Sequence, residues 1–290
     1  MSTPNNKRLI IIPLSGHQLI KLLVYSLLVI NYGLYIVGEW QVAQHTLSAS
    51  SGLLDWAASF KTSIDETAWF VLLIIFELET YVLSDHAFTP ARVRAMNIVR
   101  AVCYLFLAHT IYVNAAAVIE LADEQPLQAM HLCELADKNI AYVYNEQYVE
   151  INSDNCNSLL IGAELYQLGD SKSITDKPGL ALAQYMSWLD LFESLSWIGV
   201  MLVIELVVGL QNKGISSGKR LRALNTTSIL FYTVLWVAIG HWIYLGHYMY
   251  AWDEFVWIAG FIAIEMNMAD WRKDMKQQGA TESGHSVSNA

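Results

Sequence analysis

The chain has 290 residues, of which 54% are hydrophobic and 15% are charged, and its formal net charge is −10. Soluble domains carry about 25% charged residues, so this composition, with a mean hydropathy of +0.34, argues against a water-soluble protein. It also argues against nucleic-acid binding, because the basic residues stand beside apolar segments and form no patch. The composition indicates an integral membrane protein whose first partner is the lipid bilayer.

Six apolar segments are the predicted transmembrane helices. They cover residues 19–37, 68–83, 99–119, 191–210, 229–245 and 255–269. A helix needs about 20 apolar residues to cross a bilayer, and the last segment reaches that length only if its polar flanks extend it. The sequence therefore predicts an all-α membrane fold with six transmembrane helices, three within residues 19–119 and three within residues 188–271.

The basic residues give the predicted orientation. Most of the 17 Lys and Arg lie at the N-terminus, between the second and third segments, between the fourth and fifth, or after the sixth. The exceptions are Lys61, Lys138, Lys172 and Lys177. Cytoplasmic loops are rich in Lys and Arg, so both termini are predicted to be cytoplasmic, in a bacterial inner membrane. Residues 1–18 form the cytoplasmic N-terminus, and the small polar residues of the tail, 272–290, predict disorder.

The segment of residues 38–67, between the first two helices, is predicted to lie at the outer membrane interface. Its apolar residues follow the spacing of an amphipathic helix. They are Leu53, Leu54, Trp56, Ala57 and Phe60. Such a helix buries its apolar face at the boundary between lipid headgroups and acyl chains.

The segment of residues 120–187 is predicted to be an extracytoplasmic loop with structure of its own. Residues 140–144 and 148–152 alternate apolar and polar side chains around Asn145-Glu146-Gln147, which predicts a β-hairpin. Cys133 and Cys156 flank it and are expected to form a disulfide, because disulfides persist in oxidising compartments. The alternative is two unpaired cysteines in an unstructured loop.

An acidic residue, a Trp four positions later and a Glu eight positions after that recur three times. The copies are Asp65/Trp69/Glu77, Glu193/Trp197/Glu205 and Asp253/Trp257/Glu265. The shift that takes Glu77 to Glu205 also aligns the following loop and the start of the next helix, including Tyr104 with Tyr232. This pattern predicts an internal repeat of three helical hairpins, with chance similarity between apolar helices as the alternative.

Glu77, Glu205 and Glu265 are the predicted ion-handling or proton-handling residues. Each lies about 18 Å along its helix from the acid that opens the motif, which is past the middle of the bilayer. An acid in hydrocarbon is costly, and it usually faces a protein interior or a water-filled path. Three such helices running in one direction would bring the glutamates to one depth, where they could bind protons or small cations.

Other polar residues are expected to support these glutamates. The acids of the motif lie near the outer boundary, whereas the basic and amide residues could pair with the glutamates from the inner one. The supporting residues are Asp65, Glu193, Asp253, Arg94, Arg222, Asn97, Asn225, His109 and His241. A metal bound by a histidine and a glutamate has no specified geometry, and the two histidines differ in depth, which disfavours haem; no cofactor is predicted.

Two functions remain open on the sequence alone. The first is a proton or small-cation channel or transporter. The second is a non-transporting membrane subunit or sensor, which binds a periplasmic protein through residues 120–187 and uses the glutamates as structural polar contacts. A redox or haem-binding enzyme ranks third, because the depths of His109 and His241 do not match. Phosphate-binding loops and hydrolase motifs are also missing from the sequence. A homo-oligomer is compatible with either of the first two.

Overall fold

The computed structural model describes residues 16–47, 50–78, 89–127, 132–136, 138, 140–157, 164–169, 172–212, 215 and 218–262. Glu265 and the predicted tail, 272–290, lie outside these residues, as do the ends of the second and sixth predicted helices. The chain forms two compact units. One is Tyr32–Ala251, and the other combines Met1–Asn31 with Trp252–Ala290.

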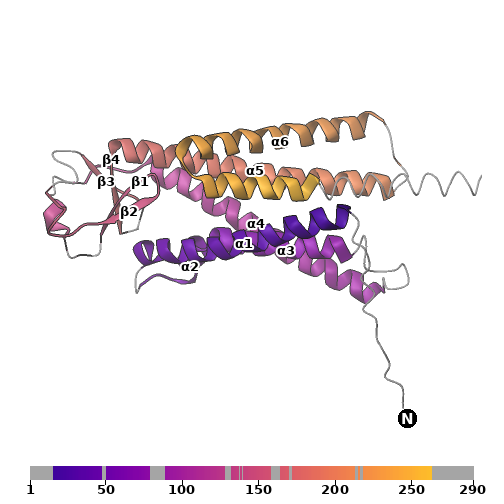
Figure 1. The fold of residues 1–290 in the computed structure, drawn as a ribbon, viewed down its shortest axis with the longest axis horizontal. Coiled ribbons are helices and arrows are strands. Elements are labelled where there is room, and N and C mark those ends of the chain that lie inside the picture. The colour runs from indigo at the N-terminus through magenta and orange to yellow at the C-terminus, as the bar shows by residue number, and fades with distance from the viewer. Residues whose placement is uncertain are drawn as a thin grey trace, which may run out of the picture. The chain divides into compact units, whose positions relative to one another are not determined.

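Helices make up most of the described chain (Figure 1). They are α1 (Gly16–Thr46), α2 (Leu53–Ser59), α3 (Lys61–Glu77), α4 (Pro90–Ala122), α5 (Lys177–Asn212) and α6 (Lys219–Leu245), followed by a helical stretch at residues 248–262. Four of them are long and apolar enough to cross a membrane: Gln18–Thr46, Pro90–Ala122, Lys177–Leu210 and Lys219–Leu245. These four contain the first, third, fourth and fifth predicted segments.

α1 is longer than the sequence pattern predicts, because it continues to Thr46 through residues 38–46 of the expected interfacial segment. Gly38 lowers helix stability but does not end a helix by itself. The extension is held by contacts, since the rings of Trp40 and Phe60 lie 6.4 Å apart and Trp56 stacks on Phe60. Of the interfacial segment, α2 remains as a separate short helix.

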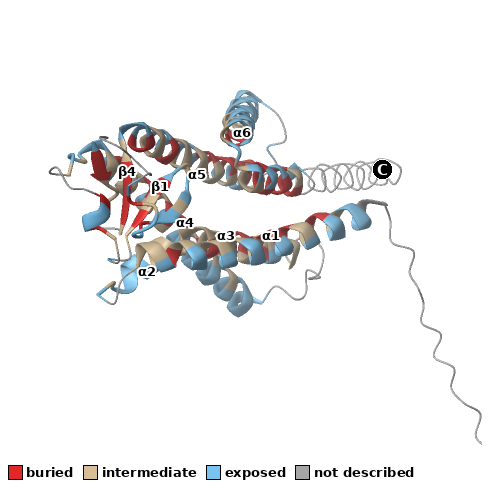
Figure 2. Cartoon of the chain, turned by 60° about the vertical axis from the view of Figure 1, so that its left-hand side comes forward, coloured by how far each residue is buried: buried red, intermediate tan, exposed pale blue. Residues whose placement is uncertain are grey.

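The helices of the unit Tyr32–Ala251 pack in chain order, with α3 on α4, α4 on α5 and α5 on α6. Their shared core contains Leu72, Leu107, Val200 and Leu235, and Figure 2 shows buried residues along α5. Trp69 and Trp197, which occupy the same position of the sequence motif, contact each other edge to face at 6.2 Å.

Two helix starts in this unit are fixed by hydrogen bonds to their first N–H groups. The Thr89 hydroxyl accepts from the Arg92 N–H, and Pro90 follows it at the position where a helix tolerates proline. α3 is capped from another helix, because Glu39 of α1 accepts from the N–H groups of Thr62 and Ser63 at 2.7 and 3.0 Å. A carboxylate there also complements the helix dipole.

A four-stranded sheet lies at the N-terminal end of α5, which it contacts (Figure 1). Its strands are β1 (Ala141–Tyr144), β2 (Gln147–Glu150), β3 (Leu165–Gln167) and β4 (Ser173–Asp176), in the order β2-β1-β4-β3. β1 and β2 pair antiparallel around Asn145 and Glu146, where the sequence places two strands. β1 pairs parallel with β4, and β3 and β4 were not predicted from the sequence.

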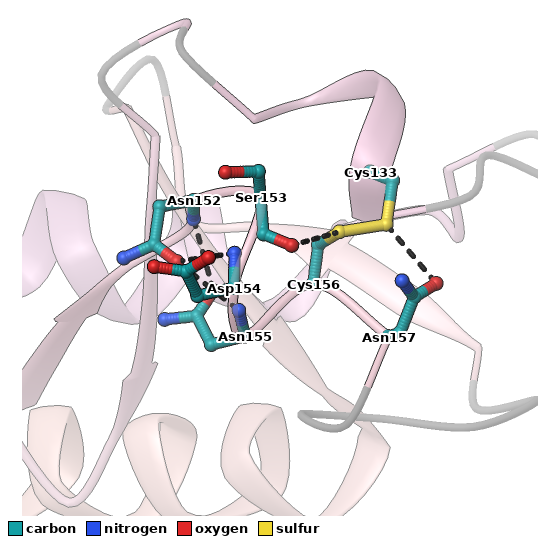
Figure 3. Close-up of a disulfide and its surroundings, with 7 residues drawn as sticks. All are labelled: Cys133, Asn152, Ser153, Asp154, Asn155, Cys156 and Asn157. Carbon is teal, nitrogen blue, oxygen red and sulfur yellow. Dashed lines mark hydrogen bonds between the residues drawn. A yellow bond between two sulfur atoms is a disulfide. The ribbon is translucent and has the colours of Figure 1, made fainter.

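The disulfide between Cys133 and Cys156 is confirmed (Figure 3). It joins the turn Leu132–Glu134 to the turn after β2, across 23 positions. Cys156 belongs to the small core of the sheet, with Leu132, Leu135, Ile151, Leu165 and Ile174. Asn152 orders the second turn, since its side-chain oxygen accepts from the N–H groups of Asp154 and Asn155.

In the other unit, the first half of α1 packs against residues 252–262. Val24 and Leu28 of α1 lie beside Gly260. The Asn31 amide donates to Asp253 Oδ1 at 3.0 Å, and both residues are buried. The acid of the third motif copy is therefore bound inside this unit by an amide.

Candidate functional site

A half-buried ion pair connects three helices near the sheet. Lys61, the first residue of α3, donates from Nζ to Asp190 Oδ2 of α5 at 2.9 Å and to Asn114 Oδ1 of α4 at 2.6 Å. Asn114 is 4% exposed, and its amide donates to Ser194 Oγ at 3.2 Å. We call Lys61, Asn114, Asp190 and Ser194 the lysine cluster.

The helix positions explain why these side chains meet. Asp190 and Ser194 are four residues apart and therefore lie on one face of α5. Lys61 stands at the helix start that Glu39 caps, and its long side chain extends to Asp190. Lys is only a donor, so the Asn114 oxygen must face it and the Asn114 N–H₂ must face α5. Each polar group of the lysine cluster thus has a definite partner.

A second polar group joins the tip of the hairpin to the end of α6. The Asn145 amide donates to the Leu245 carbonyl, and Asn145 Oδ1 lies 2.9 Å from His247 Nε2. Tyr250 donates its hydroxyl to Glu146 Oε2 at 2.8 Å, and His247 Nδ1 lies 3.7 Å from the same oxygen. We call Asn145, Glu146, His247 and Tyr250 the tip cluster.

The two clusters interact electrostatically. Burial raises the pKa of Glu146 and the charge of Asp190 raises it further, while the Tyr250 hydrogen bond, His247 and Lys61 oppose the rise. Burial, together with the charge of Glu146, raises the pKa of Tyr148 to about 12. Glu193 also acts on Lys61. This end of the bundle therefore gathers carboxylates around one ammonium group.

Asp65 and Glu193, two predicted supporting acids, lie at this end and bind tryptophans. Asp65 accepts from Trp69 Nε1 at 3.0 Å, within one turn of α3. Glu193 accepts from Trp242 Nε1 of α6 at 2.8 Å. Both acids are therefore hydrogen-bonded by indole N–H groups.

The predicted glutamates lie farther along the helices. Glu205 of α5 is exposed on the described surface and accepts a hydrogen bond from the Tyr104 hydroxyl of α4. Glu77 is the last residue of α3 and is half-buried. Because Glu265 is outside the described residues, convergence of the three glutamates stays a prediction.

The remaining predicted residues do not join either cluster through a hydrogen bond or ion pair that the structure assigns. Arg94, Asn97, Arg222 and Asn225 are exposed, near the N-terminal ends of α4 and α6. Asn97 accepts a hydrogen bond from Arg100 on its own helix.

The two predicted histidines also lie outside the clusters. His241 Nδ1 lies 2.9 Å from the Val237 carbonyl of the same helix, and its ring lies 5.8 Å from that of Tyr185. His109 is half-buried on α4. Among the described residues, no group of three or more His, Cys, Asp or Glu side chains is positioned to bind a metal.

Sequence reasoning missed the residues that form both clusters. In the sequence, Lys61 contributes only to the predicted membrane orientation, and Asn145 and Glu146 contribute only to the predicted hairpin turn. One usable signal was the spacing of four between Asp190 and Ser194 at the start of an apolar run. A second was Lys61 itself, a cation close to a predicted span on the side that is poor in Lys and Arg.

No model of a protein family, no curated protein and no solved structure matches this chain. Its chemistry therefore has to be inferred from its own residues. Both clusters contain ionisable groups. The lysine cluster lies between helices, and the tip cluster joins the hairpin to the end of α6. They can carry charge, hold helices together, or respond to pH.

Proposed function

We propose that this protein conducts or transports protons or small cations across a bacterial inner membrane. In this proposal, six transmembrane helices place both termini in the cytoplasm and residues 120–187 outside. The lysine cluster is the observation that carries the proposal. Charged side chains inside a membrane bundle are costly and commonly mark the route of an ion or proton.

The carboxylates near Lys61 suit the outer entrance of such a route. The negative charge of four carboxylates exceeds the positive charge of Lys61, and a negatively charged entrance concentrates cations. These carboxylates belong to Asp65, Glu146, Asp190 and Glu193. Glu205, with Tyr104, would be the next proton-binding group along α5. Glu77 and Glu265 would complete the inner level, as the repeat predicts.

Buried apolar residues lie between these two levels along the helices. Leu107 is 1% exposed and Val200 is 0% exposed, and Leu72 and Leu235 are also buried. An ion cannot cross such apolar packing without water or a polar partner. The proposal therefore requires the helices to move during transport, and the described arrangement corresponds to a closed state.

The test is flux into liposomes that contain the full chain and a pH-sensitive or cation-sensitive dye. Asp190→Asn and Glu205→Gln each remove a charge, and we expect flux to fall about tenfold or more, because one charge-assisted hydrogen bond contributes about 1.5 kcal/mol or more. Glu150→Gln, on the exposed strand β2, is the matched control and should leave flux unchanged. A folded wild-type protein that gives no flux under any proton, sodium or potassium gradient would contradict the proposal.

A second candidate is a non-transporting subunit or sensor, as a single chain or a homo-oligomer, whose sheet binds a periplasmic protein. It is favoured by the tip cluster, which hydrogen-bonds the sheet directly to the end of α6. In this alternative, Glu205 and Tyr104 are a structural interhelical contact. Absence of flux with an intact fold would support this candidate.

A further inference from the structure

We propose that the contact between His247 and Glu146, here called the latch, is controlled by one proton. It holds the hairpin tip against the turn after α6, here called the joint. The joint is Leu245, Gly246 and His247, between α6 and the helical stretch 248–262. The proposal does not depend on transport, because it concerns how one contact responds to pH.

The hydrogen bonds of Asn145 define the state of one imidazole nitrogen. The Asn145 N–H₂ group donates to the Leu245 carbonyl at 2.9 Å, so its oxygen is the atom that faces His247 Nε2. An amide oxygen only accepts. Nε2 must therefore carry a hydrogen in this arrangement.

The other imidazole nitrogen then determines the response to pH. Nδ1 lies 3.7 Å from Glu146 Oε2. In a neutral ring with its hydrogen on Nε2, Nδ1 is an acceptor and faces a second acceptor. One additional proton removes this conflict, as an imidazolium next to a carboxylate or as a carboxyl group next to a neutral ring. Histidine exchanges that proton near neutral pH.

The charges near Glu146 have opposing effects on the binding of the additional proton. Asp190 of α5 favours an added proton, and Lys61 of α3 opposes it. Tyr250 remains a hydroxyl donor, because burial and the charge of Glu146 raise its pKa. Tyr148 of β2 likewise stays neutral, with its pKa raised to about 12. Tyr250 and Tyr148 therefore keep their hydrogens, which leaves His247 and Glu146 as the pair that shares the added proton.

The backbone on both sides suits a latch at a joint. Gly246 has φ +85°, the left-handed conformation that ends α6. Asn145 and Glu146 have φ +50° and +60°, which is uncommon for a glutamate. The side-chain bonds of the tip cluster offset this conformational cost. Since the closed latch binds the proton more tightly, it should be fastened at low pH and released as pH rises.

Hydrogen exchange on the full chain in lipid nanodiscs tests this proposal. Protection of residues 145–148 and 246–251, relative to unstructured peptide at the same pH, is compared between about pH 5.5 and about pH 8. We expect up to about fivefold more protection at the acidic end, the effect of a partly exposed ion pair. His247→Gln retains a donor but no charge and should abolish the pH dependence.

Two further variants make the result decisive. Glu146→Gln still accepts from Tyr250 and should also abolish the pH dependence, which covers the case in which His247→Gln does not fold. His45→Gln is the matched control, because His45 stacks on Tyr148 of the same hairpin but lies outside the tip cluster. Protection that does not change with pH in the wild type, or that changes equally in Glu146→Gln, would overturn the proposal. This experiment applies no ion gradient, so its result does not depend on the outcome of the flux experiment.

Discussion

Lys61 joins α3 to both α4 and α5 through its side chain. It binds Asn114 and Asp190 at once, and the side chains of the ion pair are 30% and 31% exposed. Its energetic contribution should therefore lie between that of an exposed ion pair, up to about 1 kcal/mol, and that of a buried pair that loses one partner, about 3–5 kcal/mol.

We expect Lys61→Met to lower the free energy of unfolding by about 1–2 kcal/mol, because Asp190 would keep its charge without its ammonium partner. The measurement is denaturant-induced unfolding in detergent. Lys138→Met, at an exposed position beside the sheet, should change stability by less than about 0.5 kcal/mol. Adding Asp190→Leu to Lys61→Met should recover part of the loss; a double variant as unstable as the sum of both singles would mean that the pair does not interact.

At the scale of elements, α5 organises the unit Tyr32–Ala251. Its 36 residues contact α4, α6 and three strands of the sheet. Gly199 allows α5 and α6 to approach closely, because a Cβ at that position would overlap the Phe231 ring of α6. Gly209, ten positions along the same helix, has open space where its Cβ would be.

Gly199→Ala should therefore destabilise the α5–α6 contact by about 1–3 kcal/mol, the usual cost of overpacking. Gly209→Ala should be neutral or stabilising by up to about 1 kcal/mol, since Ala favours helix over Gly. Thermal unfolding of both variants in one detergent gives the comparison. Equal effects of the two substitutions would mean that the Phe231 ring moves aside without cost.

At the scale of the whole molecule, membrane-length helices are combined with a sheet that has a separate core and a covalent crosslink. The sheet core is small, and domains of this size often need disulfides. The disulfide closes a loop across 23 positions. Loops of this length give about 3 kcal/mol in the chain-entropy description.

Replacing Cys133 and Cys156 by serine should therefore cost the sheet up to about 3 kcal/mol of local stability. Hydrogen exchange should accelerate in residues 140–176, while exchange in α4 and α6 stays as in the wild type. Cys103→Ala, at the buried free cysteine of α4, should leave the sheet unchanged. If the serine variant exchanged like the wild type, the packing of Leu132, Ile151 and Ile174 would suffice to hold the sheet.

The predictable parts of this fold are those encoded locally. Long apolar runs identified the four membrane-length helices, and alternation with two flanking cysteines identified β1, β2 and the disulfide. β3 and β4 are buried at almost every residue, so they do not follow the alternating pattern of a half-buried strand. Lys61 and Asp190 are 129 positions apart, and nothing local to either residue specifies that they meet. The sequence motif singles out Asp65 and Glu193, but it does not specify the tryptophans that they bind.

The apolar face of α2 bears on how this protein has to be handled. Leu53 is 86% exposed and Leu54 is 75% exposed, next to the stacked rings of Trp56 and Phe60. In water these side chains form an exposed hydrophobic patch that promotes aggregation. Extraction should therefore succeed in long-chain maltosides or in nanodiscs whose apolar rim extends to α2, whereas short-chain detergents should leave the helix uncovered and cause the purified protein to aggregate.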